Sequence, residues 1–445
     1  MTERLEKILI SSSSSQWHQR IRDLHRKLFE ATYFDASDER NKQLMNIIRA
    51  VRERKEQALQ EFTQKFDGVS KPEWQLRVSR EKLSAAHDSI DKELLASIRR
   101  SIGNVRKYQE KIFVSKKSVL SGSTGIKYTP IKRVGVCVPG ASAPLPSTVV
   151  MTAVPARVAG VEEIAVVSPP RYKGGIHPVI LAVCYELKID EVYAIGGAQA
   201  VAALAYGTES IRPVDKIVGP GNAWVQMAKR EVFGVVDIDS IAGPSEVLIV
   251  ANDSARAAFV AADMLSQAEH APGAALLFTD SEKLAKDVLI ELEKQLAGLE
   301  RRQETTKCLL DFGGIVVFES LEDCIKQADF FAAEHLEIQC GKDSRKIAER
   351  IENAGAIFIG DFSPVAVGDY WAGPSHTLPT GTTARFFSAL SSNDFVKSTS
   401  IIEYGEKQLA ESASDIIRLS QTEGLDAHAK SIQIRQGKFP PEKSS

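Results

Sequence analysis

The sequence predicts an α/β protein with mostly parallel sheets, on the strength of two series of alternating elements. Between residues 133 and 222, four short β-branched runs each end in Gly or Pro and precede an Ala-rich helical stretch. A second alternating series begins at residue 246. Strands that alternate with helices form βαβ units, in which consecutive strands run parallel.

The first series consists of four expected strands, at residues 133–138, 163–167, 191–195 and 215–218. Each is stopped by a turn residue, such as the Pro-Gly pair at 139–140 or the Gly-Pro-Gly-Asn run at 219–222. Ligands of parallel sheets bind beyond the carboxyl ends of the strands. We therefore expect functional residues in these turns.

The second series has expected strands at 246–251, 274–279, 314–318 and 356–359, with helices at 255–269 and 281–296 between them. Before both series, residues 1–112 are expected to be mostly helical scaffold, because apolar residues recur there three or four positions apart. From about residue 386 the alternation ends, and residues 406–436 are expected to form a helical tail.

Composition excludes several classes of function. The 445 residues include 56 Lys and Arg against 58 Asp and Glu, so neither nucleic acid nor an anionic membrane is an expected partner. No apolar run approaches the roughly 18 residues of a membrane span, and the charged first ten residues do not resemble a secretory signal. The five cysteines are scattered without a CxxC pair, as expected for packing residues of a cytoplasmic protein.

Two short polar motifs could carry chemistry. Gln267 and His270 are three residues apart near the end of an expected helix, so both side chains could reach one metal ion. The alternative is a polar helix end beside the turn at 272–273. Glu334 and His335 are adjacent within an apolar run, and at a bend they could act together as acid and base. Alone, such a pair is more often a cap or a surface pair.

Two further segments are candidates. The Gly/Pro-rich loop 368–381 contains Asp369 and His376, and such a loop is either a binding element or a structural turn. In the tail, the segment that contains Glu423 and His428 by itself favours a solvated helix over a functional site. The glycine turns at 196–200 and 219–222 could hold pyrophosphate at a helix N-terminus, but neither matches the G-x-G-x-x-G fingerprint.

Together, these motifs resemble those of the histidinol dehydrogenase family. The matching segments are GGAQA (196–200), VGPGN (218–222), AGPSEV (242–247), SQAEH (266–270), AEHL (333–336) and HTLPT (376–380). They occur in the family's order and at similar spacings. The resemblance runs from about residue 30 to the C-terminal helix, and several long motifs in register are far more specific than any one of them.

The resemblance implies two incomplete Rossmann-like domains, a helical N-terminal segment and a helical C-terminal tail, assembled as an interlocked homodimer. Residues 1–35 would form the N-terminal arm. Residues 36–136 and 247–386 would form a discontinuous α/β domain with the zinc and acid/base residues. Residues 137–246 would form the NAD-contacting domain, and residues 387–445 the tail that reaches the partner subunit.

The resemblance also implies one zinc ion per subunit, held by Gln267, His270, Asp369 and, from the partner subunit, His428. This zinc would orient the substrate rather than activate water. Glu334 and His335 would be the catalytic pair.

Substrate contacts would come from the metal ligands and His335, together with Ser245 and Glu423; His376 is a further candidate. NAD would contact Gln199 and Asn222. Many relatives have a Y-V-P-G-G pattern where this chain has Cys137 and Ala141 in place of the Tyr and the last Gly. Because the Tyr contact would be missing at Cys137, we expect altered affinity for NAD.

The implied reaction is the oxidation of L-histidinol to L-histidine through bound L-histidinaldehyde, with two NAD, as the last step of histidine biosynthesis. One alternative is a zinc-dependent, NAD-linked paralogue that acts on another amino-alcohol or on a sulfonated diol. Retention of Glu423, His428 and the 373–380 loop favours histidinol. A second alternative is a catalytically silent zinc-binding dimer, which the presence of every implied catalytic residue and ligand disfavours.

Overall fold

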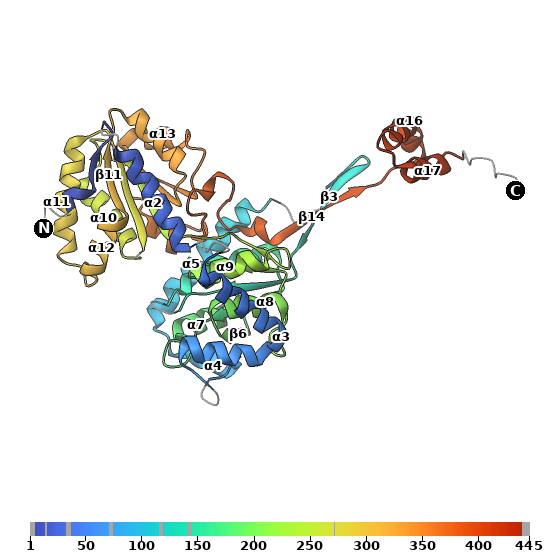
Figure 1. The fold of residues 1–445 in the computed structure, drawn as a ribbon, viewed down its shortest axis with the longest axis horizontal. Coiled ribbons are helices and arrows are strands. Elements are labelled where there is room, and N and C mark those ends of the chain that lie inside the picture. Colours follow the sequence, from blue (N-terminus) through green and yellow to red (C-terminus); the bar gives the residue numbers. More distant parts are fainter. Residues whose placement is uncertain are drawn as a thin grey trace. The chain divides into compact units, whose positions relative to one another are not determined.

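The computed structural model describes residues 5–13, 16–32, 37–70, 74–114, 119–140, 144–270 and 272–437 (Figure 1). Its contacts divide the chain into two compact units. The first unit comprises Met1–Phe113 and Pro130–Phe395, and the second comprises Val114–Thr129 and Val396–Ser445.

One sheet of the first unit has five parallel strands in the order β6-β5-β4-β7-β8. The strands are β4 (Arg133–Cys137), β5 (Glu163–Ser168), β6 (Glu191–Ala194), β7 (Lys216–Val218) and β8 (Asp237–Ile238). The four strands expected between residues 133 and 218 are confirmed. After β6 the chain crosses to the other side of β4, so the carboxyl ends of β4 and β7 flank the switch point at which open parallel sheets bind ligands.

Two layers of helices cover this sheet. The connecting helices are α6 (Pro146–Ala159), α7 (Pro178–Glu186), α8 (Gly197–Tyr206) and α9 (Ala223–Val232). The N-terminal helices α3 (Glu39–Asp67), α4 (Arg80–Ser89) and α5 (Lys92–Ile112) contact α8, α7 and α6, respectively. Helix α8 is apolar on nearly all sides and needs an outer cover. We expected residues 36–136 to group with residues 247–386. Instead, α3, α4 and α5 pack on the helices of the first sheet, and β4 is a strand of that sheet.

The second sheet of this unit has six parallel strands in the order β1-β11-β10-β9-β12-β13. They are β1 (Leu9–Ser11), β9 (Ser245–Ala251), β10 (Gly273–Thr279), β11 (Gly313–Val317), β12 (His335–Gln339) and β13 (Ala356–Ile359). The four strands expected in this region are confirmed, whereas β1 and β12 were not predicted. The N-terminal segment is therefore not wholly helical, because its strand β1 extends the edge of this sheet.

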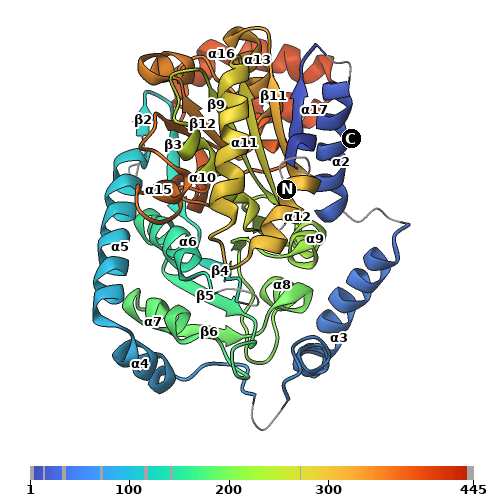
Figure 2. The same cartoon turned by 90° about the vertical axis from the view of Figure 1, so that its left-hand side faces the viewer.

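Alternate residues of these strands build two cores. The helices are α2 (Gln16–Thr32), α10 (Ala257–Ala268), α11 (Glu282–Leu296), α12 (Arg302–Phe312), α13 (Leu321–Phe331) and α14 (Ser344–Ala348). Ile249 and Leu277 pack with α10, α11 and α12 on one face, where Figure 2 shows α11 lying along the strands. Leu248 and Leu276 pack with α2 and α13 on the other face. A sheet buried on both faces is typical of parallel α/β folds.

Short elements complete the first unit. Helix α15 (Val365–Tyr370) follows β13 and carries Asp369. Four 3₁₀ turns are η1 (Glu6–Ile8), η2 (Gly341–Asp343), η3 (Thr383–Arg385) and η4 (Ser392–Phe395).

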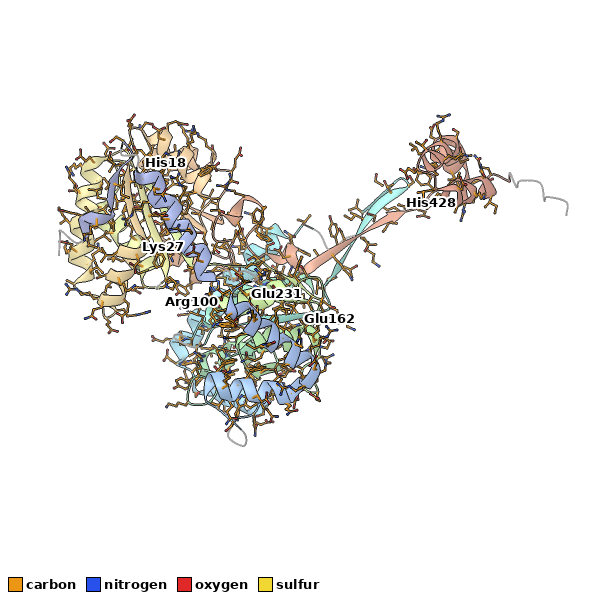
Figure 3. The ribbon with its side chains drawn as sticks, in the orientation of Figure 1. His18, Lys27, Arg100, Glu162, Glu231 and His428 are labelled. Carbon is orange, nitrogen blue, oxygen red and sulfur yellow. The ribbon has the colours of Figure 1, made fainter. Side chains whose placement is uncertain are left out.

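The second unit contains a three-stranded sheet in the order β14-β3-β2 and two helices. Its elements are β2 (Val119–Ser121), β3 (Thr124–Pro130), β14 (Val396–Ile402), α16 (Glu406–Thr422) and α17 (Asp426–Arg435). The expected helix over 406–436 is thus two helices, separated at Gly424, which has a left-handed φ of 71°. The tail expected from residue 387 is not wholly helical, because β14 pairs within this sheet. His428 lies on α17 (Figure 3).

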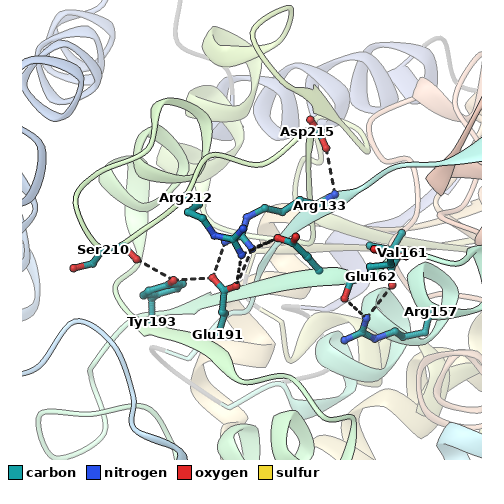
Figure 4. Close-up of polar contacts among 10 residues, drawn as sticks. Arg133, Arg157, Val161, Glu162, Glu191, Tyr193, Ser210, Arg212 and Asp215 are labelled. Atoms are coloured by element: carbon teal, nitrogen blue, oxygen red, sulfur yellow. Dashed lines mark hydrogen bonds and ion pairs between the residues drawn. The ribbon is translucent and has the colours of Figure 1, made fainter.

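An ion network ties together the amino ends of three strands of the first sheet (Figure 4). Arg133, the buried first residue of β4, bonds Glu163 at 2.9 Å and Glu191 at 2.7 and 2.9 Å. Those carboxylates begin β5 and β6, and Glu191 also accepts from the hydroxyl of Tyr193 at 2.9 Å. The network lies at the edge opposite the carboxyl ends of the strands.

Among the described residues, no helix is both long and apolar enough to cross a membrane.

Candidate active site

A cavity of about 180 Å³ is lined by residues from both sheets of the first unit. Its lining includes Gly219, which follows the carboxyl end of β7. It also includes Ser245 and His335, which are the first residues of β9 and β12. The expected position beyond the carboxyl ends of strands therefore applies to the first sheet alone. The second sheet contributes the amino ends of its central strands.

A bend in the backbone places Glu334 and His335 together. Ala332 ends α13 in the left-handed conformation, with φ 54°, and β12 begins at His335. Both residues line the cavity although a regular strand would direct them to opposite faces. A bend thus precedes this dipeptide, which is the condition under which the two side chains could act together.

Glu334 is held by two donors. Its Oε2 accepts a hydrogen bond from the hydroxyl of Ser245 at 2.6 Å and one from the backbone N–H of Glu246 at 2.9 Å. Burial raises the pKa of Glu334, although the imidazole of His335 and these two donors oppose the change. The carboxyl group is therefore fixed in position and poised to hold or release a proton.

The imidazole of His335 is oriented by a backbone carbonyl. Nδ1 lies 3.1 Å from the carbonyl oxygen of Glu246, which can only accept, so this nitrogen carries the hydrogen. Nε2 is buried without a hydrogen-bond partner among the described residues, 3.8 Å from Oδ1 of Asp369. Burial lowers the pKa of His335, but Glu334 and Asp369 outweigh it and raise the pKa to about 9.

The end of α10 presents Gln267 and His270. Gln267 is buried, and its Nε2 has no hydrogen-bond partner among the described residues, while Oε1 is 3.5 Å from the hydroxyl of Ser245. His270 lines the cavity. A Cβ at Gly273 would lie 2.6 Å from the carbonyl oxygen of Gln267, so only glycine lets β10 approach this helix end.

Asp369 and the loop that follows it form a further part of the cavity lining. Burial would raise the pKa of Asp369, but neighbouring imidazoles, that of His335 first, hold it below its ordinary value. His376 also lines the cavity, and its Nε2 is 3.1 Å from the hydroxyl of Ser147. The backbone N–H of Gly381 donates to the carboxyl group of Glu246, which anchors the end of this loop.

Gln267, His270 and Asp369 offer an amide oxygen, an imidazole nitrogen and a carboxylate, a donor set that suits a divalent cation such as zinc. The chemistry of this donor set is the observation that favours a cation, with Oε1 of Gln267 as the amide ligand, whereas the unpaired Nε2 of Gln267 can only donate. No group of three or more His, Cys, Asp or Glu side chains forms a metal cluster in the part of the chain that the structure describes. These residues fit as a partial ligand set that lacks a fourth donor.

The expected tail residues lie in the other unit. Glu423 is the exposed C-terminal cap of α16, and His428 is exposed on α17. The structure thus brings seven expected site residues together at or beside the cavity. They are Ser245, Gln267, His270, Glu334, His335, Asp369 and His376.

A second cavity, of about 320 Å³, is lined by Gln199 and Asn222 together with the rings of Phe66 and Trp224. Asn222 also caps α9, since its Oδ1 accepts from the N–H of Val225 at 3.2 Å. Cys137 is buried at the end of β4, and burial raises the pKa of its thiol to about 12. Ala141 lies outside the described residues.

The loop at 219–222 joins the two cavities. Gly219, Pro220 and Gly221 line the smaller one, and Asn222 lines the larger one. Gly219 has φ 106°, and a Cβ there would lie 2.3 Å from the carbonyl oxygen of Cys137. This turn therefore requires glycine.

Comparisons with known proteins point to a single family. The family model described as histidinol dehydrogenase matches residues 33–436. The chain belongs to the histidinol dehydrogenase family. The histidinol dehydrogenase of Rhodopirellula baltica is 47% identical over 393 residues, which cover 87% of this chain and 85% of that protein. That of Synechococcus sp. is 46% identical over 415 residues, with 92% and 95% covered.

A solved structure of the same family has a matching fold. The crystal structure of histidinol dehydrogenase from Elizabethkingia anophelis is 32% identical, with a TM-score of 0.88 over 96% of this chain and 98% of that one. The α/β architecture with parallel sheets is therefore that of the histidinol dehydrogenase family.

Sequence reasoning missed two parts of this family member's site. Glu246 binds Glu334 and His335 through its backbone and Gly381 through its side chain. The signal that could have indicated Glu246 is an acidic residue at the second position of a buried strand. The ion pair of Lys229 and Asp239 is also buried and lines the cavity. Nothing in its local pattern distinguishes it from a surface pair.

Proposed function

We propose that this chain is an NAD-dependent histidinol dehydrogenase that oxidises L-histidinol to L-histidine through a bound aldehyde. The observation that carries the proposal is the fixed pair of Glu334 and His335. An imidazole whose Nδ1–H is held by a carbonyl, with an unpaired Nε2, lies beside a carboxyl group in one cavity. Oxidation of an alcohol to an acid requires a base and an activated water, and this pair provides one group for each task.

Zinc is proposed at Gln267, His270 and Asp369, with His428 of a second copy as the fourth ligand. When bound, zinc would supply a positive charge that holds the amino-alcohol by its nitrogen and oxygen atoms. Two features support a ligand from a second copy: the donor set beside the cavity lacks a fourth member, and His428 is exposed in a separate unit. Glu423, close to His428 in sequence, is proposed to pair with the substrate ammonium group.

NAD is proposed to extend from the larger cavity to the smaller one along the loop 219–222. The aromatic walls provided by Phe66 and Trp224 suit an adenine ring, and Gln199 and Asn222 supply polar contacts. When bound, NAD accepts a hydride from the substrate carbon. The amino ends of α8 and α9 are positioned at the carboxyl edge of the first sheet, where they favour phosphate groups.

Each residue of the pair then has a defined task. Nε2 of His335, in the neutral form of the imidazole, removes the hydroxyl proton while the carbon loses a hydride, which gives the aldehyde. Because the pKa of His335 is raised to about 9, this step should become faster as the pH rises toward 9. Glu334 takes a proton from water as the water oxygen adds to the aldehyde carbon, and protonated His335 returns its proton to the aldehyde oxygen, which gives the hydrate and a neutral imidazole. His335 next removes a hydrate proton as the second hydride leaves, and the resulting acid releases its own proton to give the carboxylate. Two hydride transfers account for the four electrons and for two NAD.

An assay of NADH formation tests the proposal directly. Purified protein is supplied with NAD and L-histidinol, and in parallel with other amino-alcohols and a sulfonated diol, before and after treatment with a chelator. We expect two NADH per histidinol consumed, loss of activity on chelation and recovery with zinc. Turnover of another alcohol without turnover of histidinol would reject the proposed substrate.

A further inference from the structure

The polar face of β12 continues beyond the catalytic histidine. His335, Glu337 and Gln339 alternate along the strand and therefore share one face. On α10, Asp263 and Gln267 are one turn apart and share a helix face, and His270 lies in the turn that follows the helix.

A buried hydrogen-bond network joins these two faces. Nε2 of Gln339 donates to Oδ2 of Asp263 at 2.9 Å and to Oε2 of Glu337 at 2.9 Å. Glu337 and Gln339 are 1% and 2% exposed, respectively. Burial raises the pKa of Glu337 well above its ordinary value, and the nearby charge of Asp263 adds to this. Burial thus favours the protonated form of Glu337, and the amide of Gln339 links its carboxyl group to that of Asp263.

The same carboxyl group holds the start of the short helix α15. Oε1 of Glu337 accepts from the backbone N–H of Val365 at 3.1 Å. Val365 is the first residue of α15, and Asp369 follows one turn later. A carboxyl group at this position satisfies one of the N–H groups that a helix start leaves without an intrahelical partner.

We propose that Glu337, bridged by Gln339 to Asp263, is a positioning residue that sets the separation between α10 and α15. Through this separation it fixes the distance between Asp369 on one side and Gln267 and His270 on the other. The inference rests on the proposed function, because it assumes that these three residues bind zinc.

The network is costly as a purely structural device. Buried carboxyl groups lose hydration, and apolar residues of similar volume often replace such groups with little loss of stability. A positioning role predicts a different signature, in which the affinity for metal falls more than the stability does. Groups behind the ligands of a metal site typically change metal affinity by 10- to 100-fold.

Two pairs of variants of the full-length protein test this role. Glu337→Met removes the carboxyl group, whereas Glu337→Gln keeps an oxygen that accepts from the N–H of Val365, although its amide nitrogen no longer accepts from Gln339. Val365→Pro removes the N–H that donates to Glu337 and also alters the buried side chain, and proline is tolerated at the first position of a helix. Val365→Ala is its matched control, because it trims the same side chain but keeps the N–H.

The readout is zinc affinity, measured by competition with a chromophoric chelator on metal-stripped protein, together with the visible absorption spectrum of the cobalt-substituted protein. We expect Glu337→Met and Val365→Pro to weaken zinc binding about 10- to 100-fold and to alter the cobalt spectrum. Glu337→Gln and Val365→Ala should stay within about threefold of the wild type, since they keep the hydrogen bonds to α15.

Folded Glu337→Met and Val365→Pro variants that bind zinc as tightly as the wild type would overturn the inference while leaving the proposed function intact. If Glu337→Met does not fold, the comparison of Val365→Pro with Val365→Ala decides. A wild type that takes up no zinc, or that binds it equally well after Gln267→Ala, would overturn the proposed site and this inference with it.

Discussion

Substitution of Glu191 by Gln should destabilise the first sheet without affecting catalysis. Glu191 accepts two hydrogen bonds from Arg133 and one from the hydroxyl of Tyr193 (Figure 4). The hydrogen bonds from Arg133, more than any other contact, lower the pKa of Glu191 to about 2. Glutamine keeps the shape of the side chain but removes the charge that the guanidinium stabilises.

The magnitude follows from that pKa. A carboxyl group whose pKa falls from about 4.3 to about 2 contributes about 3 kcal/mol of stability at neutral pH. The side chain is 20% exposed, so solvent screening reduces the expected loss to about 1.5–2 kcal/mol. For a unit of this size, whose entropy of unfolding is about 0.8 kcal/mol per kelvin, that corresponds to a decrease in Tm of about 2–3 °C.

The pH dependence has a definite sign. Because the folded pKa is lower than the unfolded one, the contribution is complete above the unfolded pKa of about 4.3 and is lost as the pH falls toward 2. The difference in Tm between wild type and Glu191→Gln should therefore be constant from pH 8 to about pH 5 and should shrink at lower pH.

Thermal unfolding of both proteins across this pH range provides the measurement, with kcat at pH 8 as the functional readout. Glu162→Gln is the matched control, because Glu162 is an exposed carboxylate beside the same strands, and only its backbone oxygen accepts from Arg157. Equal Tm values for wild type and Glu191→Gln at pH 7, or an equal decrease in Glu162→Gln, would refute the reasoning.

Three further predictions concern the proposed chemistry. His335→Asn should lower the rate of alcohol oxidation about 10²- to 10⁴-fold and leave zinc content unchanged; retained activity would exclude His335 as the base. Glu334→Gln should slow oxidation of the aldehyde more than that of the alcohol, measured with each substrate separately, and equal losses would argue against water activation. His428→Ala should reduce zinc content and activity, and heterodimers with Asp369→Ala should regain some active sites; demonstrated heterodimers without any recovery would contradict a shared site.

Strands with apolar or β-branched patterns could be predicted from the sequence because both faces of a parallel sheet are buried. The four strands of the first series and four of the second were expected on this basis. Strand β12 was not, because its sequence HLEIQ alternates polar and apolar residues, as an exposed edge does. Its polar face is buried instead, where Glu337 and Gln339 bond to each other and to Asp263.

The candidate site could be predicted only through the combination of motifs. Gln267 and Glu334 are 67 positions apart, and nothing in either segment indicates that Ser245 lies between them in space. Family resemblance supplied that link. Resemblance did not anticipate which sheet the helices of residues 39–112 cover, because that depends on the fully apolar α8, whose outer surface requires them.

The left-handed residue before β12 connects the local backbone to the chemistry. In a regular strand, Glu334 and His335 would point to opposite faces, and one of them would leave the cavity. Ala332 adopts φ 54° instead, at a cost of about 1 kcal/mol for a residue with a Cβ. The bend lets Glu334 meet Ser245 before the strand starts, while pairing of β12 with β9 fixes the direction of His335. Strain at one alanine thus accompanies the side-by-side placement of an acid and a base in consecutive positions of the chain.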